Sequence, residues 1–462
     1  MKERKIPNNA DWKILKGVFD DKFLGKYFSN LENEFNVTNE ADFFARLVNM
    51  STANKEPFHR WIRYREGYAG ELVKEILRRY PINPNKHFLM DPMCGSGSSL
   101  VAAKELGVDA VGLDVNGYAV LSSNVKSRRY SQADKKNIED SISKFRRVNL
   151  ATRSTPSASY AIDIEKYFPH KNFAELLKIN EWIRRSITHD VSFDFFHLAF
   201  LASLEDCSDR KKDGNGLATR PAPVHDPKER ILAQLVLMFD DVKSYSRDEG
   251  ASCYSVDSSA LELSAAASEL TLKTKRSLHS IIFSPPYANS FDYFESYKLE
   301  LIFGGFVTAD DLKEAKSRLI RNFRITKPKS VQKEITSVEK LSAEILKRIP
   351  EKEAETGVRD GRTRLVPNML RGYFEDMNQV MKLGFDSLSS GGMMHIVVDQ
   401  SAYVGVPIPT DLIFAALAKD IGYEVTGVIS CRRANTSGQQ LKKFPFLKDL
   451  LRESIVSLRK PI

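Results

Sequence analysis

Apolar and polar positions follow one another along the chain with the spacings of both helices and strands. In residues 68–77 the apolar side chains recur three and four positions apart, and 172–187 and 193–204 repeat this spacing, which predicts amphipathic helices. Two short apolar runs, 88–90 and 110–113, each end in an aspartate and predict strands. A helix fits between them, so this region is expected to form a βαβ unit.

Later segments continue the alternation of strands and helices. The region 130–250 is expected to be mostly helical, with a polar loop rich in glycine and proline at 211–227. The pattern predicts an α/β fold with a doubly wound, mainly parallel sheet and a long helical insertion. The other expected strands are 252–256, 280–283, 393–398, 425–431 and 454–458, and the other expected helices are 373–388 and 410–421.

Composition narrows the class of protein. The chain has 462 residues, of which 42% are hydrophobic and 28% charged, enough apolar material for a large core and too much for a disordered or fibrous chain. No apolar run is long enough to span a membrane, and the N-terminus lacks the apolar core of a signal peptide. The four cysteines and eight histidines show no metal-ligand spacing. We therefore expect a metal-free protein of a reduced, cytoplasmic compartment.

The net charge of +9 is concentrated in one stretch. Residues 306–371 contain 16 Lys and Arg against 10 Asp and Glu. Six basic residues between positions 318 and 333 follow one another with no acidic residue between them. Such a cluster is either a solvated helix face or a contact surface for a polyanion.

A glycine-containing turn joins the first predicted strand to its helix. The sequence is Asp91-Pro-Met-Cys-Gly-Ser-Gly97, in which the glycines let the backbone approach a ligand at a helix N-terminus. By itself the turn is weak evidence, because the third glycine of the dinucleotide-binding pattern is replaced by Leu100. Asp114, at the end of the next strand, is placed to accept hydrogen bonds from ribose hydroxyls, which predicts a nucleoside cofactor.

A second motif, Ser284-Pro-Pro-Tyr287, follows the apolar strand at 280–283. The two prolines remove N–H donors and fix the turn, which leaves carbonyl groups free to face a pocket. A carbonyl and the Ser284 hydroxyl are suited to accept both hydrogens of an exocyclic amine, and Tyr287 is suited to stack on a planar base. The alternative is an ordinary strand exit.

Together, these two motifs resemble those of the DNA amino-methyltransferases, which transfer a methyl group from S-adenosylmethionine to cytosine N4 or adenine N6. The resemblance covers roughly residues 57–130 and 250–460, and it implies a class I methyltransferase fold with a seven-stranded sheet. Double-stranded DNA is then the expected substrate. The residues that it assigns to the cofactor are Trp61, Asp91, Pro92, Cys94, Gly95, Ser96, Gly97, Asp114 and Asp257, and those that it assigns to catalysis are Ser284, Pro285, Pro286 and Tyr287.

Serine at the first position of the tetrapeptide is typical of cytosine-N4 enzymes in this family, whereas Asp or Asn is typical of adenine-N6 enzymes. The expected reaction is a direct in-line attack by the amine of a flipped-out base, without a covalent intermediate. Adenine N6 is the first alternative, and methylation of an RNA or protein amine is the second. A nicotinamide-dependent oxidoreductase would leave Ser284–Tyr287 unexplained. Cys94 lies in the cofactor loop and is expected to be structural.

The resemblance also divides the chain into parts. Because the chain ends shortly after its last predicted strand, the DNA sequence is expected to be read by an insertion, and the basic one is the candidate for phosphate contact. The predicted contacts there are Arg318, Arg321, Arg324, Lys327 and Lys329. By analogy we expect a bacterial or archaeal, nucleoid-associated protein with a possible cognate restriction endonuclease. The predicted parts are an N-terminal helical segment (1–56), a cofactor-binding half (57–129), a helical insertion (130–250), a catalytic half (251–305), a basic insertion (306–371) and the remainder of the sheet (372–462).

Overall fold

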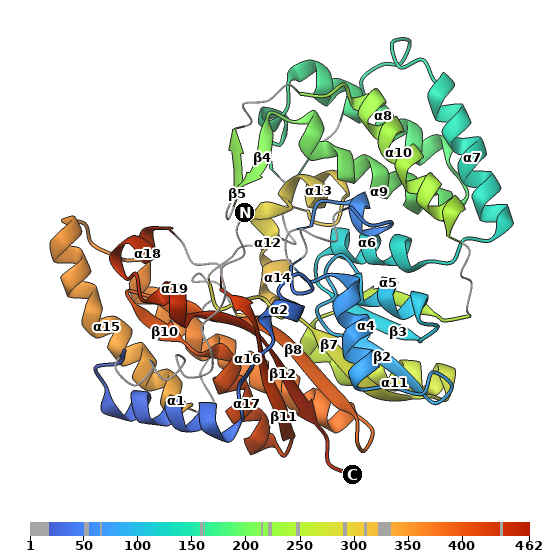
Figure 1. Ribbon diagram of the computed structural model, residues 1–462. Coiled ribbons are helices and arrows are strands. Elements are labelled where there is room, and N and C mark those ends of the chain that lie inside the picture. Colours follow the sequence, from blue (N-terminus) through green and yellow to red (C-terminus); the bar gives the residue numbers. More distant parts are fainter. Residues whose placement is uncertain are drawn as a thin grey trace.

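A large twisted sheet forms the centre of the computed structural model (Figure 1). Its strand order is β1-β11-β12-β8-β7-β2-β3-β6, and every strand runs in the same direction except β12, which is antiparallel to both neighbours. The predicted α/β fold with a mainly parallel sheet is therefore confirmed. The strands are β1 (Thr38–Asn39), β2 (His87–Asp91), β3 (Ala110–Asp114), β6 (Cys253–Asp257), β7 (Ser277–Phe283), β8 (Met393–Asp399), β11 (Glu424–Arg433) and β12 (Arg452–Arg459).

The sheet has eight strands, one more than the family resemblance implies. The additional strand is β1, whose two residues pair in parallel with Ile429 and Ser430 of β11. This extended segment covers backbone groups that would otherwise lie at the exposed edge of the sheet. The structure describes residues 18–49, 55–64, 67–157, 160, 162–213, 216–219, 224–245, 250–289, 293–308, 312–321, 334–434 and 438–462.

Helices cover both faces of the sheet because successive strand residues point to opposite sides. In β2, Phe88 and Met90 belong to one apolar cluster, and Leu89 between them belongs to another. The first face packs against α1 (Lys22–Glu34), α11 (Leu263–Thr274), α15 (Thr336–Thr356), α16 (Val366–Ser387) and α17 (Thr410–Ile421). The second face packs against α2 (Ala41–Phe44), α4 (Gly70–Arg79) and α5 (Ser98–Glu105).

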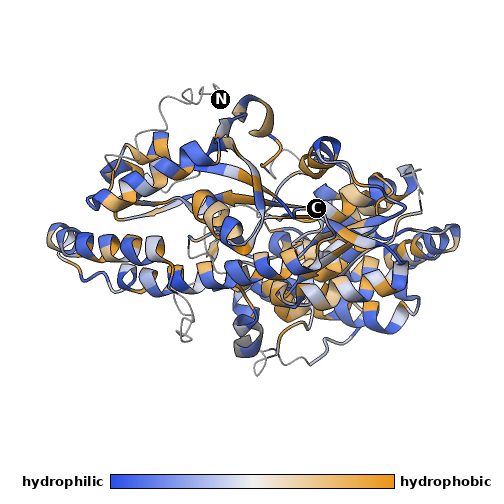
Figure 2. Cartoon of the chain, turned by 90° about the horizontal axis from the view of Figure 1, so that it is seen from below, coloured by the Kyte–Doolittle hydropathy of each residue, from blue (hydrophilic) through white to orange (hydrophobic). Residues whose placement is uncertain are grey.

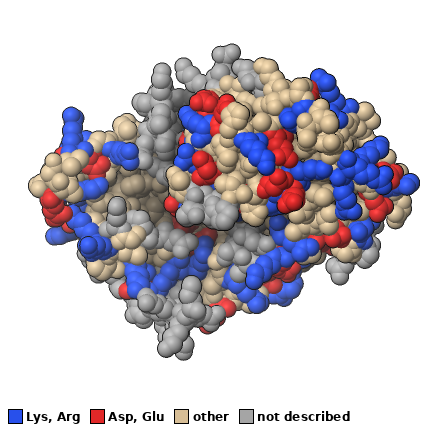
Figure 3. All heavy atoms as spheres, turned by 90° about the horizontal axis from the view of Figure 1, so that it is seen from above, with Lys and Arg blue, Asp and Glu red and all other residues tan. Residues whose placement is uncertain are grey.

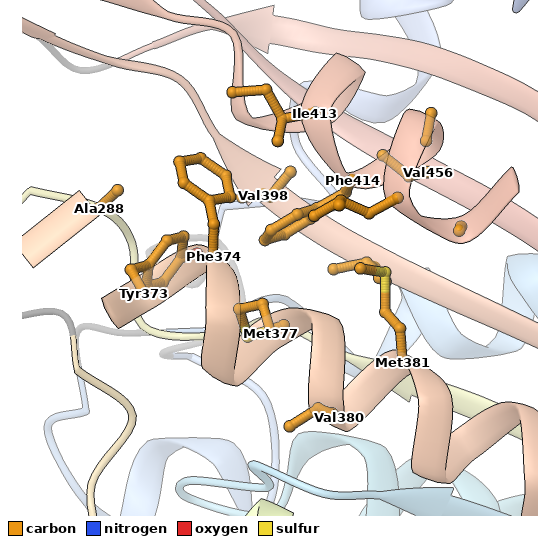
Figure 4. Packing of buried hydrophobic residues seen from close by; sticks show 14 of the residues in the cluster. Ala288, Tyr373, Phe374, Met377, Val380, Met381, Val398, Ile413, Phe414 and Val456 are labelled. Carbon is orange, nitrogen blue, oxygen red and sulfur yellow. The ribbon is translucent and has the colours of Figure 1, made fainter. Parts of the chain in front are cut away.

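The core on the first face is built from large side chains of α16. Tyr373, Phe374 and Met377 of this helix are fully buried and point toward the sheet and α17 (Figure 4). Phe414 of α17 packs against Phe374, with ring centroids 5.9 Å apart. Apolar and polar residues lie on different sides of the outer helices (Figure 2), as the amphipathic spacing predicts.

A separate helical lobe stands beside the sheet and has its own apolar core (Figure 1). It contains most of the predicted helical insertion, together with two helices from the chain that follows Tyr287. The lobe is built from α7 (Gln132–Arg147), α8 (His170–Ser186), α9 (Asp190–Cys207), α10 (Pro227–Ser244), α12 (Tyr293–Ser296) and α13 (Lys298–Phe303). Helix α6 (Gly117–Ser127) packs on β3 and β6 of the sheet and contacts the lobe through α9.

The polar loop expected at 211–227 is in part a β-hairpin. Strands β4 (Arg210–Asp213) and β5 (Gly216–Thr219) pair in antiparallel fashion. The hairpin is anchored because Lys212, a residue that looks solvated in the sequence, is buried and donates a 2.5 Å hydrogen bond to Glu300 of α13. A buried charge pair of this kind holds a polar strand against the lobe.

Short elements complete the fold. They are η2 (His59–Trp61), η3 (Glu165–Tyr167), η4 (Ala260–Glu262), η5 (Thr363–Leu365), α14 (Leu312–Ser317), α18 (Gly438–Lys443), α19 (Leu447–Leu450), and a second hairpin of β9 (Ser401–Tyr403) and β10 (Val406–Ile408). In the part of the chain that the structure describes, we find no helix with the length and apolar character needed to cross a membrane. The same residues include no group of three His, Cys, Asp or Glu side chains placed to hold a metal ion.

Candidate functional site

A cavity of about 720 Å³ opens at the carboxyl ends of the parallel strands. This is the edge at which doubly wound sheets bind ligands. The loops after β2, β3, β6 and β7 line it, as do residues near the ends of β8 and β11 and the beginning of antiparallel β12. The predicted site residues that line it are Asp91, Pro92, Cys94, Gly95, Ser96, Asp114, Ser284, Pro285, Pro286, Tyr287 and Arg318.

The glycine turn after β2 is held in place by its close packing. Gly97 has a φ of +85°, and a Cβ atom there would lie 2.6 Å from the Cβ atom of Ser123 on α6. The Gly95 N–H group donates a 2.9 Å hydrogen bond to Asp114. Gly97 does not line the cavity, so its role here is to let the turn pack on α6, and Gly95 and Ser96 face the space where a ligand would lie.

Asp114 ends β3 with its carboxylate at the cavity wall. Each of its oxygens accepts one 2.9 Å hydrogen bond from a backbone N–H group, from Gly95 and from Asn116. Carboxylate oxygens have further acceptor sites, which are available to hydroxyl donors. Burial raises the pKa of Asp114 to about 6, partly offset by these backbone hydrogen bonds.

Asp91 ends β2 and is buried beneath the same turn. It accepts hydrogen bonds from the hydroxyl groups of Ser99 (2.5 Å) and Tyr68 (3.1 Å) and from the Met93 N–H group (3.0 Å). Burial raises the pKa of Asp91 to about 7. The Tyr68 hydroxyl also lies 3.3 Å from the Ile282 carbonyl of β7, so Asp91 and Tyr68 connect the cofactor turn to the strand that leads to Ser284.

Cys94 is buried in the turn, and its thiol stays protonated. Burial raises its pKa well above the usual value, and the nearby Asp114 and Asp91 carboxylates add to this effect. Its sulfur packs under β3, where a side chain at Gly112 would lie 2.6 Å from it. These contacts give Cys94 the properties expected of a structural cysteine.

The tetrapeptide Ser284–Tyr287 leaves the end of β7 and faces the cavity. Ser284 Oγ donates a 3.4 Å hydrogen bond to Tyr287 Oη, which in turn donates a 2.7 Å hydrogen bond to Glu453 Oε1. Glu453 is 2% exposed and forms an ion pair with Arg432 through its other oxygen. Burial and the carboxylates of Glu453 and Asp399 raise the pKa of Tyr287 well above its usual value, so its hydroxyl stays protonated.

Trp61 does not reach the cavity, which corrects its predicted contact with the cofactor. It is 1% exposed, packs beside Phe195 of the helical lobe and donates a 2.8 Å hydrogen bond from Nε1 to Asp241 of α10. The same segment reaches the cavity through Tyr64 and Tyr68 instead. The Tyr64 ring stacks on Tyr297 of the lobe with centroids 4.9 Å apart.

Asp257 and Arg318 meet at the rim of the cavity. They form a 2.8 Å ion pair, and Asp257, whose side chain is 56% exposed, is not among the lining residues. The three residues after it, Ser258, Ser259 and Ala260, do line the cavity. The acid predicted to lie near the cofactor thus lies at the edge of the space, next to a predicted DNA contact.

The other basic residues of the predicted cluster differ in their surroundings. Arg321 is only 12% exposed and donates hydrogen bonds to Asp376 and Glu375 of α16, so its charge is already matched within the fold. We therefore do not retain it as a DNA contact. Arg324, Lys327 and Lys329 lie outside the described residues.

Several residues that line the cavity were not predicted as site residues from the sequence, among them Tyr68, Phe294, Asp399 and Glu453. Tyr68 and Phe294 look like core positions of amphipathic segments. Asp399 and Glu453 lie opposite each other in the pairing of β8 with β12. The sequence does show a charged pair, Arg452-Glu453, at the beginning of an apolar strand. That this pair lies at the cavity can be recognised only when the order and direction of the strands are known.

The cavity fits the nucleoside cofactor that the motifs predict. Its volume lies within the range of small-molecule sites. It offers the Asp114 carboxylate to ribose hydroxyls. It also contains a glycine turn that is tightly packed, since a Cβ atom on Gly95 would lie 3.0 Å from the Tyr64 ring.

On the outer surface, one face of the molecule is hollowed, with Lys and Arg side chains on both sides of the hollow (Figure 3).

Comparisons with known proteins give relatives that match most of the chain, although no family model matches it. The chain is 24% identical to the Type II methyltransferase M.BsoBI of Geobacillus stearothermophilus, over 92% of this chain and 90% of that protein. It is 25% identical to the Type II methyltransferase M.AvaI of Nostoc sp. and to that of Anabaena variabilis, in each case over 90% of this chain and 89% of the relative. Coverage this extensive means that the similarity includes both the sheet and the helical lobe.

Proposed function

We propose that this chain is a DNA methyltransferase that uses S-adenosylmethionine to methylate the exocyclic N4 atom of cytosine in double-stranded DNA. The observation that carries the proposal is that the glycine turn, Asp114 and Ser284–Tyr287 all line the same cavity. Similarity to proteins named Type II methyltransferases supports it, and it also supports a place in a restriction–modification system. A cognate endonuclease is part of the proposal.

The cofactor half of the cavity is formed by the turn after β2 and by Asp114. The Asp114 carboxylate would accept hydrogen bonds from the ribose hydroxyls, while Gly95 and Ser96 leave room for the rest of the cofactor. When bound, S-adenosylmethionine supplies an electrophilic methyl group on a sulfonium sulfur. Tyr68 and Asp91 hold the turn at a fixed distance from β7, which positions the two halves of the cavity relative to each other.

The target half is formed by Ser284–Tyr287. The Ser284 hydroxyl and nearby backbone carbonyl groups would accept hydrogen bonds from a base amine, and the Tyr287 ring would stack on the base. Serine at position 284 favours cytosine N4 as the target on the family resemblance. An amine inside a duplex cannot reach a half-buried serine in the wall of a cavity, so the base would have to leave the helix.

Contact with DNA would begin at the rim of the cavity. Arg318 lies there, and the basic residues that follow it in the sequence, Arg324, Lys327 and Lys329, supply further charge for phosphates. We propose these residues as backbone contacts. The helical lobe borders the cavity through Phe294 and is the candidate for reading bases.

Sequencing of native DNA tests this proposal directly. The chain is expressed in a host without DNA methylation of its own, and single-molecule sequencing then reports modified bases and their context. We expect N4-methylcytosine at one recurring sequence, and loss of the mark in Ser284→Ala and Tyr287→Ala. Unmodified DNA from a host that contains folded protein would refute the proposal, and N6-methyladenine would reassign the target base.

A further inference from the structure

We propose that Glu453 is a positioning residue that sets the direction of the hydrogen bonds at Ser284, so that the serine acts as an acceptor and the cavity selects a base with an amine group. This inference rests on the proposed function and adds a residue that lies outside the glycine turn and outside Ser284–Tyr287. Glu453 lies about 170 positions after Ser284 in the sequence but lines the same cavity.

The topology of the sheet brings Glu453 to the site. Strand β12 is antiparallel, so its first residues lie at the edge where the parallel strands end. Glu453 is paired across the sheet with Arg432 of β11 on one side and with Asp399 of β8 on the other. Its carboxylate is almost fully buried, and both oxygens are used: one accepts from Arg432 and the other from Tyr287.

Ser284, Tyr287 and Glu453 form a series of two hydrogen bonds, and the direction of both follows from the chemistry of Glu453. A carboxylate that is paired with an arginine only accepts hydrogen bonds. Tyr287 therefore has to use its single O–H hydrogen as the donor to Glu453, at 2.7 Å. What remains at Tyr287 Oη is acceptor capacity, and Ser284 uses its own hydrogen to donate to it, at 3.4 Å.

This arrangement leaves Ser284 Oγ with only lone pairs to offer the cavity. An amine presents hydrogens there and is accepted, whereas a keto oxygen at the same place would meet a second acceptor. Unpaired polar groups in a buried site cost enough free energy to discriminate strongly between two bases. Cytosine carries an amine where uracil carries a keto oxygen, and adenine and hypoxanthine differ in the same way.

The substitution Glu453→Gln is expected to reverse the direction of both hydrogen bonds, from Ser284 to Tyr287 and from Tyr287 to residue 453. An amide has one oxygen and one NH₂ group, and Arg432, which can only donate, takes the oxygen. The NH₂ group then faces Tyr287, which has to accept. Tyr287 in turn donates to Ser284, and the serine hydrogen is directed into the cavity.

Equilibrium binding tests this reversal without the methylation step. The probes are two duplexes that carry the sequence identified by native sequencing, one with the amine base at the target position and one with the keto base (uracil for cytosine, hypoxanthine for adenine). Affinities are measured with S-adenosylhomocysteine present. For each protein we take the ratio of its affinity for the amine duplex to its affinity for the keto duplex. The keto base is mispaired with its partner base and flips out more easily, but this effect is the same for the wild type and the variant. It therefore cancels when the ratio of the variant is divided by the ratio of the wild type.

We expect Glu453→Gln to lower the amine-to-keto ratio by about tenfold, the effect of exchanging one hydrogen bond. A matched control is Glu424→Gln, which neutralises an exposed carboxylate at the other end of the same strand pair. It should leave the ratio unchanged. An equal ratio in wild type and Glu453→Gln would overturn the proposal.

A second variant separates this role from a merely structural one. Tyr287→Phe removes the hydroxyl that connects the serine to the glutamate and retains the ring. In that background Glu453→Gln should no longer change the ratio, and an undiminished change would show that Glu453 does not act through Tyr287. If Glu453→Gln fails to fold, Tyr287→Phe alone should lower the ratio, since Ser284 loses its acceptor. A wild-type protein that neither marks nor binds DNA would refute the proposed function instead.

Discussion

At the scale of single residues, Asp114 combines a site role with an unusual titration. Its pKa is raised to about 6 by burial, so the carboxylate gains a proton just below neutral pH. The protonated form is a weaker acceptor for ribose hydroxyls than the carboxylate. We therefore predict that the Kd for S-adenosylmethionine, measured by calorimetry, rises as the pH falls from 7 to 5.

The isosteric variant Asp114→Asn provides the control for this prediction. An amide does not titrate in this range, so the variant should bind more weakly at pH 7 and lose the part of the pH dependence that Asp114 contributes. An affinity in the wild type that stays constant between pH 5 and 7 would contradict the assignment.

Residues of this kind differ in how well the sequence reveals them. Asp114 and Ser284 could be predicted because each ends an apolar run, and a strand end next to turn residues is visible in one dimension. Glu453 could not, because its role depends on β12 running antiparallel between β8 and β11. Trp61 was misassigned because an aromatic residue near a cofactor motif has the same local pattern whether it faces the cofactor or a neighbouring core.

At the scale of elements, the packing of the glycine turn against α6 requires a residue without a side chain. We predict that Gly97→Ala destabilises the protein by about 3 kcal/mol, because it combines a left-handed backbone conformation with a contact of 2.6 Å to Ser123. Urea denaturation measures the free energy of unfolding. The comparison variant is Gly357→Ala, which has a φ of +66° and no neighbour within 4 Å, and it should cost only about 1 kcal/mol.

The beginning of β12 depends on a second buried charge group. Arg452 is 1% exposed and donates a 2.7 Å hydrogen bond to Asp411 of α17 and a 3.0 Å hydrogen bond to Glu32 of α1. Asp411→Asn removes one charge and should lower the free energy of unfolding by about 3 kcal/mol, since a buried arginine loses a partner. The exposed pair of Glu424 and Arg459 is the reference, and Glu424→Gln should change stability by less than about 1 kcal/mol. Similar losses in both variants would contradict this interpretation.

Two of the elements that sequence reasoning missed, the hairpin of β4 and β5 and the edge strand β1, are short and polar. Strands β2, β3, β7 and β8 have apolar runs of their own and could be predicted. The hairpin of β4 and β5 could not, because Lys211 and Lys212 look like a solvated loop until the partner of Lys212, Glu300, is known. Strand β1 has only two residues, and its existence depends on the free edge of β11.

At the scale of the whole molecule, the distribution of basic charge leads to a prediction about DNA binding. Replacing Arg324, Lys327 and Lys329 by glutamine removes up to three phosphate contacts. The slope of log K against log salt should then become shallower by about 2 to 3. Fluorescence anisotropy with a DNA duplex between 50 and 300 mM salt provides the measurement.

Arg321 offers a matched control from the same stretch of sequence. Its guanidinium group is already paired with Asp376 and Glu375, so Arg321→Gln should lower the thermal stability and leave the salt slope unchanged. An unchanged slope in the triple variant would show that these residues do not contact phosphates and that the basic stretch is a solvated surface.

The core of the helical lobe is assembled from two distant pieces of sequence. Helices α12 and α13, which follow the tetrapeptide directly, contribute Phe294 and Phe303 to the same apolar cluster as α7 to α10. An exchange of recognition regions between relatives therefore cannot use 130–250 as an independent cassette. A functional chimera would have to carry 293–307 together with it. Under the proposed role of the helical lobe in reading bases, the part of the gene that encodes DNA specificity is therefore discontinuous.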